Sequence, residues 1–134
     1  MKLGSRLWGL LYSLFGQPPR HELLSLTGRN VRFEHAQEGP GAELMQEYFR
    51  DVLARHACVE RAYFCALRYD EERPSPALCL APELADPSPV FNDLGRTMTA
   101  HFTGGFSIDV LVVSMAQERE LERVCAPFYE RSRP

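Results

Sequence analysis

The hydrophobic pattern of this chain switches repeatedly between the two-residue period of a strand and the 3.6-residue period of a helix, and this order constrains the fold more than any short motif. Residues 106–114 give the clearest strand, because apolar residues from Phe106 to Val112 alternate with a second series that points the other way. Residues 43–56 give the clearest helix, because their large apolar side chains fall on one stripe. The predicted elements, in chain order, are a strand at 31–35, a helix at 43–56, strands at 60–69 and 76–81, a helix at 90–102, a strand at 106–114 and a helix at 116–124.

This order predicts an α+β domain of βαββαβ type with an additional C-terminal helix. The apolar runs at 60–69 and 76–81 flank a charged turn at 70–74, which indicates a hairpin. Because βαβ crossovers are right-handed, the simplest closure is a ferredoxin-like split-βαβ antiparallel sheet with the spatial strand order 4-1-3-2. With 134 residues and a hydrophobic content of 45%, the chain is expected to bury one core.

An amphipathic segment precedes this predicted domain. Leucines and aromatic residues recur at helical spacing over residues 2–15, and the sequence Gln17-Pro18-Pro19 ends the pattern. We therefore divide the chain into an N-terminal amphipathic helix with its connector, residues 1–28, and an α+β domain, residues 29–134. The large side chains on the apolar face of the segment are Leu7, Trp8, Leu11 and Phe15.

The apolar run of this segment is far shorter than the ~20 residues that a membrane-spanning helix needs. The residues that follow it offer no small-x-small cleavage site of the kind that ends a secretory signal. We expect the apolar face to pack against protein, either its own domain or a second copy. A bilayer surface and a cleaved signal are the alternatives.

The charge balance argues against a nucleic-acid partner. The formal net charge is −3, and charges of both signs are mixed along the chain. The basic end is N-terminal, because the first 35 residues carry five Lys or Arg against two acids. RNA-recognition domains with the same element order also need an aromatic and basic motif on their third strand. The predicted third strand, residues 76–81, has neither.

No grouping of side chains predicts catalysis. His101, Ser107 and Asp109 are close in sequence, but the strand pattern places Ser107 and Asp109 on one extended strand and His101 late in a helix. The chain has no G-x-S-x-G elbow, and Gly104-Gly105 precedes a strand rather than opening a helix as a phosphate-binding loop does. We expect no catalytic residues, no cofactor and no metal.

The four cysteines have no C-x-x-C spacing, so neither a zinc site nor a redox motif is supported. Free buried thiols fit a reducing, cytoplasmic compartment best. A turn centred near Glu72 would bring Cys65 and Cys79 near each other as reduced thiols.

Two further sets of residues are predicted to have structural or interaction roles. Asp109 is expected to meet Arg32 of the neighbouring first strand as a cross-strand pair of opposite charges. Pro127 must turn the chain, and Phe128 and Tyr129 bury area only if the tail folds back as a packing clasp. Phe128 is the ring expected to be mostly buried. The alternative is an exposed aromatic tail that a partner binds.

Several stretches of the chain carry a family resemblance. Residues 28–33 (GRNVRF) lead through a Pro40 loop into a helix, and residues 59–63 (VERAY) follow. Residues 106–110 (FSIDV) and the terminal residues 126–129 (APFY) complete the set. From Val31 onward the chain resembles the C-terminal domain of the enhanced serine sensitivity (SseB) protein family. The resemblance implies a bacterial, cytoplasmic protein with no established catalysis and no active-site residues to carry over.

The expected function is therefore a non-enzymatic interaction or regulatory module that self-associates through the sheet face opposite the two crossover helices. Its partner would be a second copy or another protein, with membrane contact only through the N-terminal helix. Two alternatives stay open. One is a domain that binds a small-molecule effector such as an amino acid, and the other is a membrane-associated or secretion-linked protein.

Overall fold

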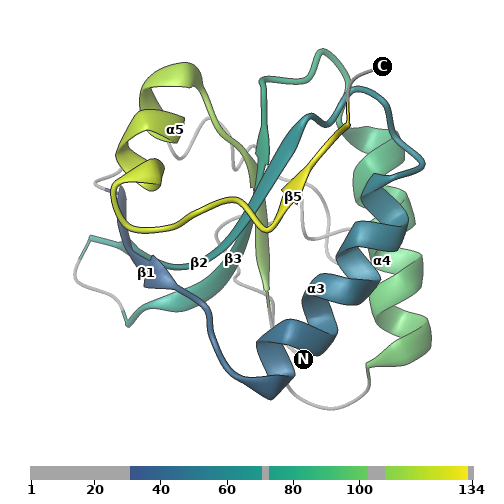
Figure 1. The fold of residues 1–134 in the computed structure, drawn as a ribbon, viewed down its shortest axis with the longest axis horizontal. Coiled ribbons are helices and arrows are strands. Elements are labelled where there is room, and N and C mark those ends of the chain that lie inside the picture. The colour runs from purple at the N-terminus through teal and green to yellow at the C-terminus, as the bar shows by residue number, and fades with distance from the viewer. Residues whose placement is uncertain (1–30, 71–72, 103–107, 133–134) are drawn as a thin grey trace.

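The computed structural model describes residues 31–70, 73–102 and 108–132, which form a mixed five-stranded sheet with helices on both faces (Figure 1). The predicted α+β class and the order of the predicted elements from 31 to 124 are confirmed, with boundaries that differ by a few residues. One short strand at the C-terminal end was not predicted. The elements are β1 (Val31–Ala36), α3 (Pro40–Leu53), β2 (Arg61–Tyr69), β3 (Ser75–Ala81), α4 (Ser88–His101), β4 (Asp109–Val112), α5 (Met115–Glu122) and β5 (Tyr129–Glu130).

Helix α3 begins where a glycine and a proline set the backbone. Gly39 has a φ of 104°, in the left-handed region that glycine adopts without steric cost. Pro40 follows in the first turn, where a missing N–H costs little because that group has no partner within the helix. Helix α3 therefore starts and ends earlier than the predicted span of 43–56.

Side chains fix the starts of the other two helices. At α5, the Ser114 hydroxyl accepts the N–H of Gln117 at 3.1 Å, and the Gln117 side chain accepts the N–H of Ser114 at 2.9 Å. This reciprocal capping box fixes the start of α5 directly after β4. At α4, the Asp86 carboxylate accepts the N–H of Ser88, the first residue of the helix, at 3.1 Å.

The strand order of the sheet differs from the prediction. The strands run β1-β2-β3-β4, with β5 also paired to β2. Strands β1 and β2 are antiparallel, as are β2 and β3, and only β3 and β4 are parallel. The sheet therefore has neither the ferredoxin-like order 4-1-3-2 nor a purely antiparallel arrangement. The handedness rule applies only to parallel pairs, and here α3 joins antiparallel strands.

The long strand β2 organises the sheet, because three strands pair with it. Along one edge, β1 pairs from Cys65 to Tyr69 and β5 pairs at Arg61 and Ala62. Strand β3 takes the other edge over seven residue pairs. The C-terminal tail thus completes the edge of β2 that β1 leaves uncovered.

Helices cover both faces of the sheet. Figure 1 shows α3 and α4 side by side on one face and α5 on the other. Adjacent residues of β2 confirm this arrangement. Phe64 packs edge-on against Phe49 of α3, with ring centroids 5.4 Å apart, and Tyr63 donates a hydrogen bond to Glu118 of α5.

The face opposite α3 and α4 therefore cannot be the self-association surface that the sequence suggested. On that face, Cys65, Leu67 and Leu111 are fully buried, with α5 packed across it. Asp109 also lies on this face and is fully buried. Sequence periodicity predicted the C-terminal helix but could not predict which surface it would cover.

The predicted proximity of Cys65 and Cys79 is confirmed, because their Sγ atoms lie 3.9 Å apart between β2 and β3. Both thiols are buried, are hydrogen-bonded to each other and form no disulfide, and Cys125 is buried near them. Burial raises the pKa of Cys79 well above its ordinary value and that of Cys125 to about 11. The Cys79 and Cys125 thiols are therefore poor nucleophiles in the folded protein.

Candidate functional site

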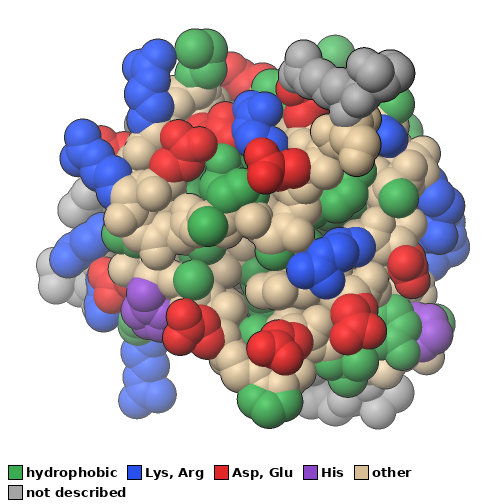
Figure 2. Space-filling model, in the orientation of Figure 1, with side chains coloured by type: hydrophobic (Ala, Val, Ile, Leu, Met, Phe, Trp, Pro, Cys, Tyr) green, Lys and Arg blue, Asp and Glu red, His purple; other side chains and the backbone are tan. Residues whose placement is uncertain are grey.

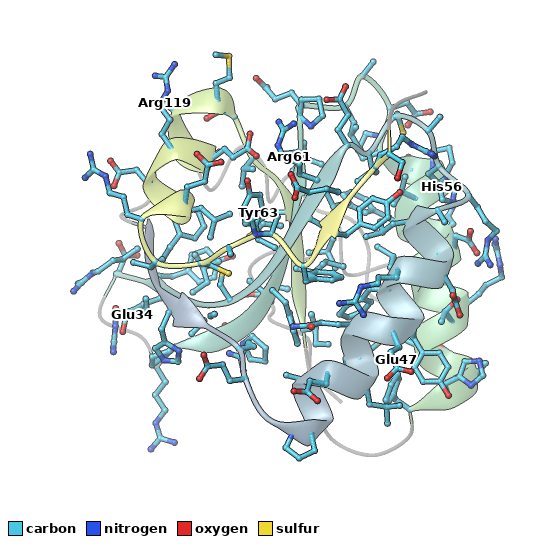
Figure 3. All side chains as sticks on the ribbon, in the orientation of Figure 1. Glu34, Glu47, His56, Arg61, Tyr63 and Arg119 are labelled. Carbon is cyan, nitrogen blue, oxygen red and sulfur yellow. The ribbon has the colours of Figure 1, made fainter. Side chains whose placement is uncertain are left out.

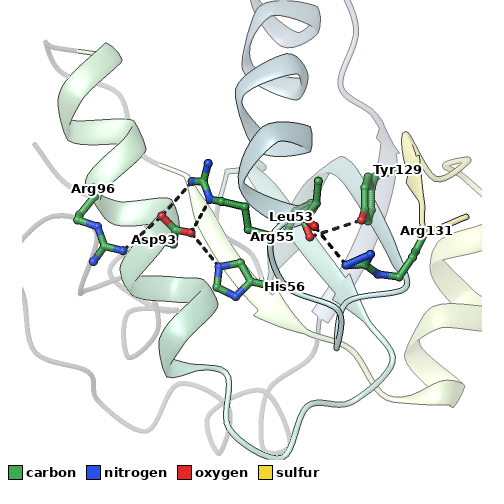
Figure 4. A network of polar contacts seen from close by, with 8 residues as sticks. Leu53, Arg55, His56, Asp93, Arg96, Tyr129 and Arg131 are labelled. Atoms are coloured by element: carbon green, nitrogen blue, oxygen red, sulfur yellow. Dashed lines mark hydrogen bonds and ion pairs between the residues drawn. The ribbon is translucent and has the colours of Figure 1, made fainter.

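The C-terminal end of α3 is joined to α4 by a network centred on Asp93 (Figure 4). Arg55 donates to both carboxylate oxygens of Asp93, from Nε at 3.2 Å and from Nη2 at 3.1 Å. His56 Nε2 lies 2.8 Å from Oδ2, and Arg96 Nη2 donates to Oδ1 at 3.3 Å. The Arg55 guanidinium, followed by His56, lowers the pKa of Asp93. Asp93 is therefore an ionised carboxylate that joins α4 to the end of α3.

On its other side, the end of α3 is held by the C-terminal tail (Figure 4). The Tyr129 hydroxyl donates to the carbonyl of Leu53 at 3.4 Å, and Arg131 Nη2 donates to the carbonyl of Ala54 at 3.2 Å. The last carbonyls of a helix have no partner within the helix, so these bonds act as a cap supplied from about 76 residues away.

Phe128 packs over the C-terminal half of α3, as the predicted clasp requires. Its ring lies 6.2 Å from that of Phe49, and the Arg50 guanidinium sits 5.4 Å from its centroid. Arg50 Nε also donates to the Phe128 carbonyl at 3.2 Å. The tail folds back as predicted, but Phe128 and Tyr129 are partly buried rather than fully enclosed. Pro127 is likewise half-buried at the turn.

A shallow groove follows the face of α4 that points away from the core. It has a volume of about 490 Å³, and the described residues that line it all belong to α4. Gly95 lies buried at its floor, Thr99 and Ala100 are small, and Arg96 joins the groove to the Asp93 network. The lining residues recur at the spacing of one helical stripe: Asn92, Gly95, Arg96, Thr99 and Ala100.

A second polar cluster lies between β2 and α5 (Figure 3). Arg61 donates to both carboxylate oxygens of Glu118, with an Nη2–Oε1 distance of 3.0 Å, and the Tyr63 hydroxyl donates to the same carboxylate. Tyr63 also reaches Glu122, at 3.2 Å. Arg61 lowers the pKa of Glu118, while burial followed by the Glu118 hydrogen bond raises the pKa of Tyr63. The cluster fastens α5 to the sheet and places no reactive group at the surface.

The predicted pair of Arg32 and Asp109 is wrong. Arg32 lies on β1 and Asp109 on β4, and two strands separate them in the sheet. Arg32 instead faces Glu34 at 3.8 Å with 62% of its side chain exposed. Asp109 is fully buried and accepts a hydrogen bond from Ser75 at 3.4 Å. The expectation failed because it depended on the strand order.

The remaining predicted residues add no reactive group. His101 stacks on Tyr48 with ring centroids 4.3 Å apart, at the side of α4 that meets α3. Among the residues that the structure describes, no three His, Cys, Asp or Glu side chains are placed to share a metal ion. Leu7, Trp8, Leu11 and Phe15 lie outside the described residues, as does Ser107.

Comparison with known proteins identifies the domain. Residues 27–131 match the family described as the SseB protein C-terminal domain. The chain belongs to this family. No curated protein and no solved structure matches the SseB-family chain. Within the described ranges, none of its helices has the length and apolar character needed to cross a membrane.

The sequence pattern did not predict the residues of the Asp93 network. Asp93 is 37 residues from His56, so no local pattern could pair them. The α4 groove had a readable signal, because small and polar residues recur on one stripe of the predicted helix. The capping box at Ser114 and Gln117 was also readable as a Ser-x-x-Gln motif.

Proposed function

We propose that this SseB-family chain is a non-enzymatic interaction module that binds a helical segment of protein along α4, and that it self-associates through this groove. The observation that carries the proposal is the shape of the groove. It is open, runs along one helix, and includes Gly95, Thr99 and Ala100 among its lining residues. Small-molecule sites are more often concave pockets that enclose their ligand, whereas a helix binds along an extended groove.

The surroundings of the groove support the same function. Helix α4 is attached to the rest of the domain, because the Asp93 network joins α4 to the end of α3 and the tail joins α3 to β2. Gly95 and Ala100 remove the side-chain bulk that would keep a second helix at a distance, so a close interaxial approach is possible. Figure 2 shows charges of both signs interspersed over the face in view, without the single-sign field that would favour a nucleic acid.

Sedimentation of the full chain over a concentration series tests the proposal. We expect reversible self-association, and we expect Ala100→Arg to weaken it by at least tenfold because the guanidinium would occupy the groove. Ala116→Arg is the matched control, since it changes another exposed alanine, on α5. A chain that stays monomeric at every concentration, or two variants that associate alike, would contradict the proposal.

A second measurement separates this function from effector binding. A ligand present at 100 times its Kd stabilises a protein by about 2.7 kcal/mol, which a thermal shift detects. We expect none of the twenty amino acids to raise the melting temperature. A shift that Ala100→Arg abolishes would make the groove an amino-acid site instead.

A further inference from the structure

We infer that the segment bound along α4 is the chain's own N-terminal amphipathic segment, residues 2–15. This inference rests on the proposed function, because it names the occupant of the same groove. The bound segment would close the groove within one molecule, and its exchange between two molecules would produce the self-association.

The segment and helix α4 have the same length, and the groove covers residues 92–100 of that helix. Residues 2–15 span 14 positions and α4 also has 14 residues, so as a helix each extends about 21 Å. The segment carries its large side chains on one face, and the α4 stripe includes Gly95, Thr99 and Ala100 beside Arg96. Large side chains fit into the space above glycine and alanine, so the two surfaces are complementary in shape.

The connector is long enough to bring the segment there. It enters β1 at Val31, which pairs with Tyr69 beside the β2–β3 hairpin. Helix α4 links β3 to the parallel strand β4, so its C-terminal end lies at the same end of the sheet. Residues 16–30 can span up to about 50 Å when extended, whereas the strands from β1 to β4 cover only about 15 Å laterally.

Charge also favours this occupant. Residues 1–30 carry four Lys or Arg against one acid, whereas the rest of the chain carries eleven against seventeen. The opposite net charges of +3 and −6 attract the segment to the domain before specific contacts form. Tethering through 15 residues also gives a millimolar effective concentration, so binding within one molecule dominates in dilute solution. Exchange between copies then grows with concentration, as in domain swapping.

The single tryptophan of the chain tests the inference directly in the full-length protein. Trp8 lies on the apolar face of the segment. We expect a blue-shifted Trp8 emission that acrylamide quenches poorly, in dilute protein without lipid. Ala100→Arg should shift the emission to the red and restore quenching, while Ala116→Arg should leave both unchanged. Circular dichroism of each variant confirms that the domain is still folded.

The outcomes separate this inference from the proposed function. If Ala100→Arg weakened self-association in sedimentation but left the Trp8 emission unchanged, the inference would be overturned. The groove would then remain an interaction site for another occupant. A Trp8 response without any self-association would overturn the proposed oligomer and retain the segment in the groove. Emission that shifts to the blue only when phosphatidylcholine and phosphatidylglycerol vesicles are added would assign the segment to a bilayer and overturn the inference.

Discussion

Arg61 of β2 and Glu118 of α5 form a two-point ion pair across the interface between the sheet and the last helix. Glu118 is only 8% exposed, so its carboxylate depends on this guanidinium and on the Tyr63 hydroxyl for charge compensation. The pair explains how a short helix stays attached to the sheet.

Replacing Arg61 should therefore be strongly destabilising. Arg61→Ala leaves a buried charge without its cation, which costs about 3–5 kcal/mol of unfolding free energy. Urea denaturation measures this loss. Arg123→Ala is the control, because its pair with Glu120 joins side chains that are 76% and 64% exposed and should contribute no more than about 1 kcal/mol. Equal losses in the two variants would mean that the Arg61 pair is solvated.

The Asp93 network should make stability depend on pH. Arg55, followed by His56, lowers the pKa of Asp93 in the folded protein below its unfolded value of about 3.9. A lowered folded pKa gives a contribution that is present above the unfolded pKa and lost as the pH falls through the folded one. We expect the unfolding free energy to fall below about pH 4.5, and to fall less steeply in Asp93→Asn.

The control for this titration is Asp51→Asn, which changes an exposed carboxylate on α3 that has no hydrogen bond to Asp93 or His56. It corrects for the loss of one negative charge. If the two variants gave the same slope against pH, the carboxylate of Asp93 would not be the group responsible.

Phe128→Ala measures the strength of the clasp. A fully buried phenylalanine costs about 3–5 kcal/mol when replaced by alanine, and Phe128 is only partly buried, so we expect about 2–3 kcal/mol. Phe49→Ala, which truncates a ring that is 1% exposed, should cost more. Thermal and urea unfolding give both values. An unchanged Phe128→Ala stability would show that the tail adds no packing energy.

Thiol reactivity should separate the cysteines into two classes. Cys58 is exposed, whereas Cys65, Cys79 and Cys125 are buried. We expect one thiol to react rapidly with Ellman's reagent in native protein and three to react only after unfolding, because the reagent needs an accessible thiolate. Cys58→Ser should remove the rapid phase. Rapid reaction of a second thiol would show that the α5 face of the sheet opens.

The fold could be predicted from the sequence where local pattern decides it. The large apolar residues of α3 and the alternation through β4 are one-dimensional signals, and both elements are present. The proximity of Cys65 and Cys79 followed from a hairpin, which is also local. The pairing of β1 with β2 was not predicted, because strand order depends on packing between elements that the pattern does not describe.

The candidate site was the least predictable part. His56 lies in the loop after α3 and Asp93 lies on α4, and Tyr129 caps α3 only because the tail pairs with β2. Strand β5 has two residues, too few to show any period. Contacts of this kind follow from the assembled tertiary structure. The predicted pair of Arg32 and Asp109 was wrong for the same reason, because it was inferred from a wrong strand order.

The pairing of β5 with β2 has a consequence for synthesis on the ribosome. Strand β2 emerges nearly seventy residues before Tyr129, and its edge at Arg61 and Ala62 must wait for the last strand. Nascent chains that expose an incomplete strand edge are prone to associate with one another. The end of the chain therefore sets the moment at which the nascent domain can close, and a stalled or shortened translation product would be released with that edge unpaired.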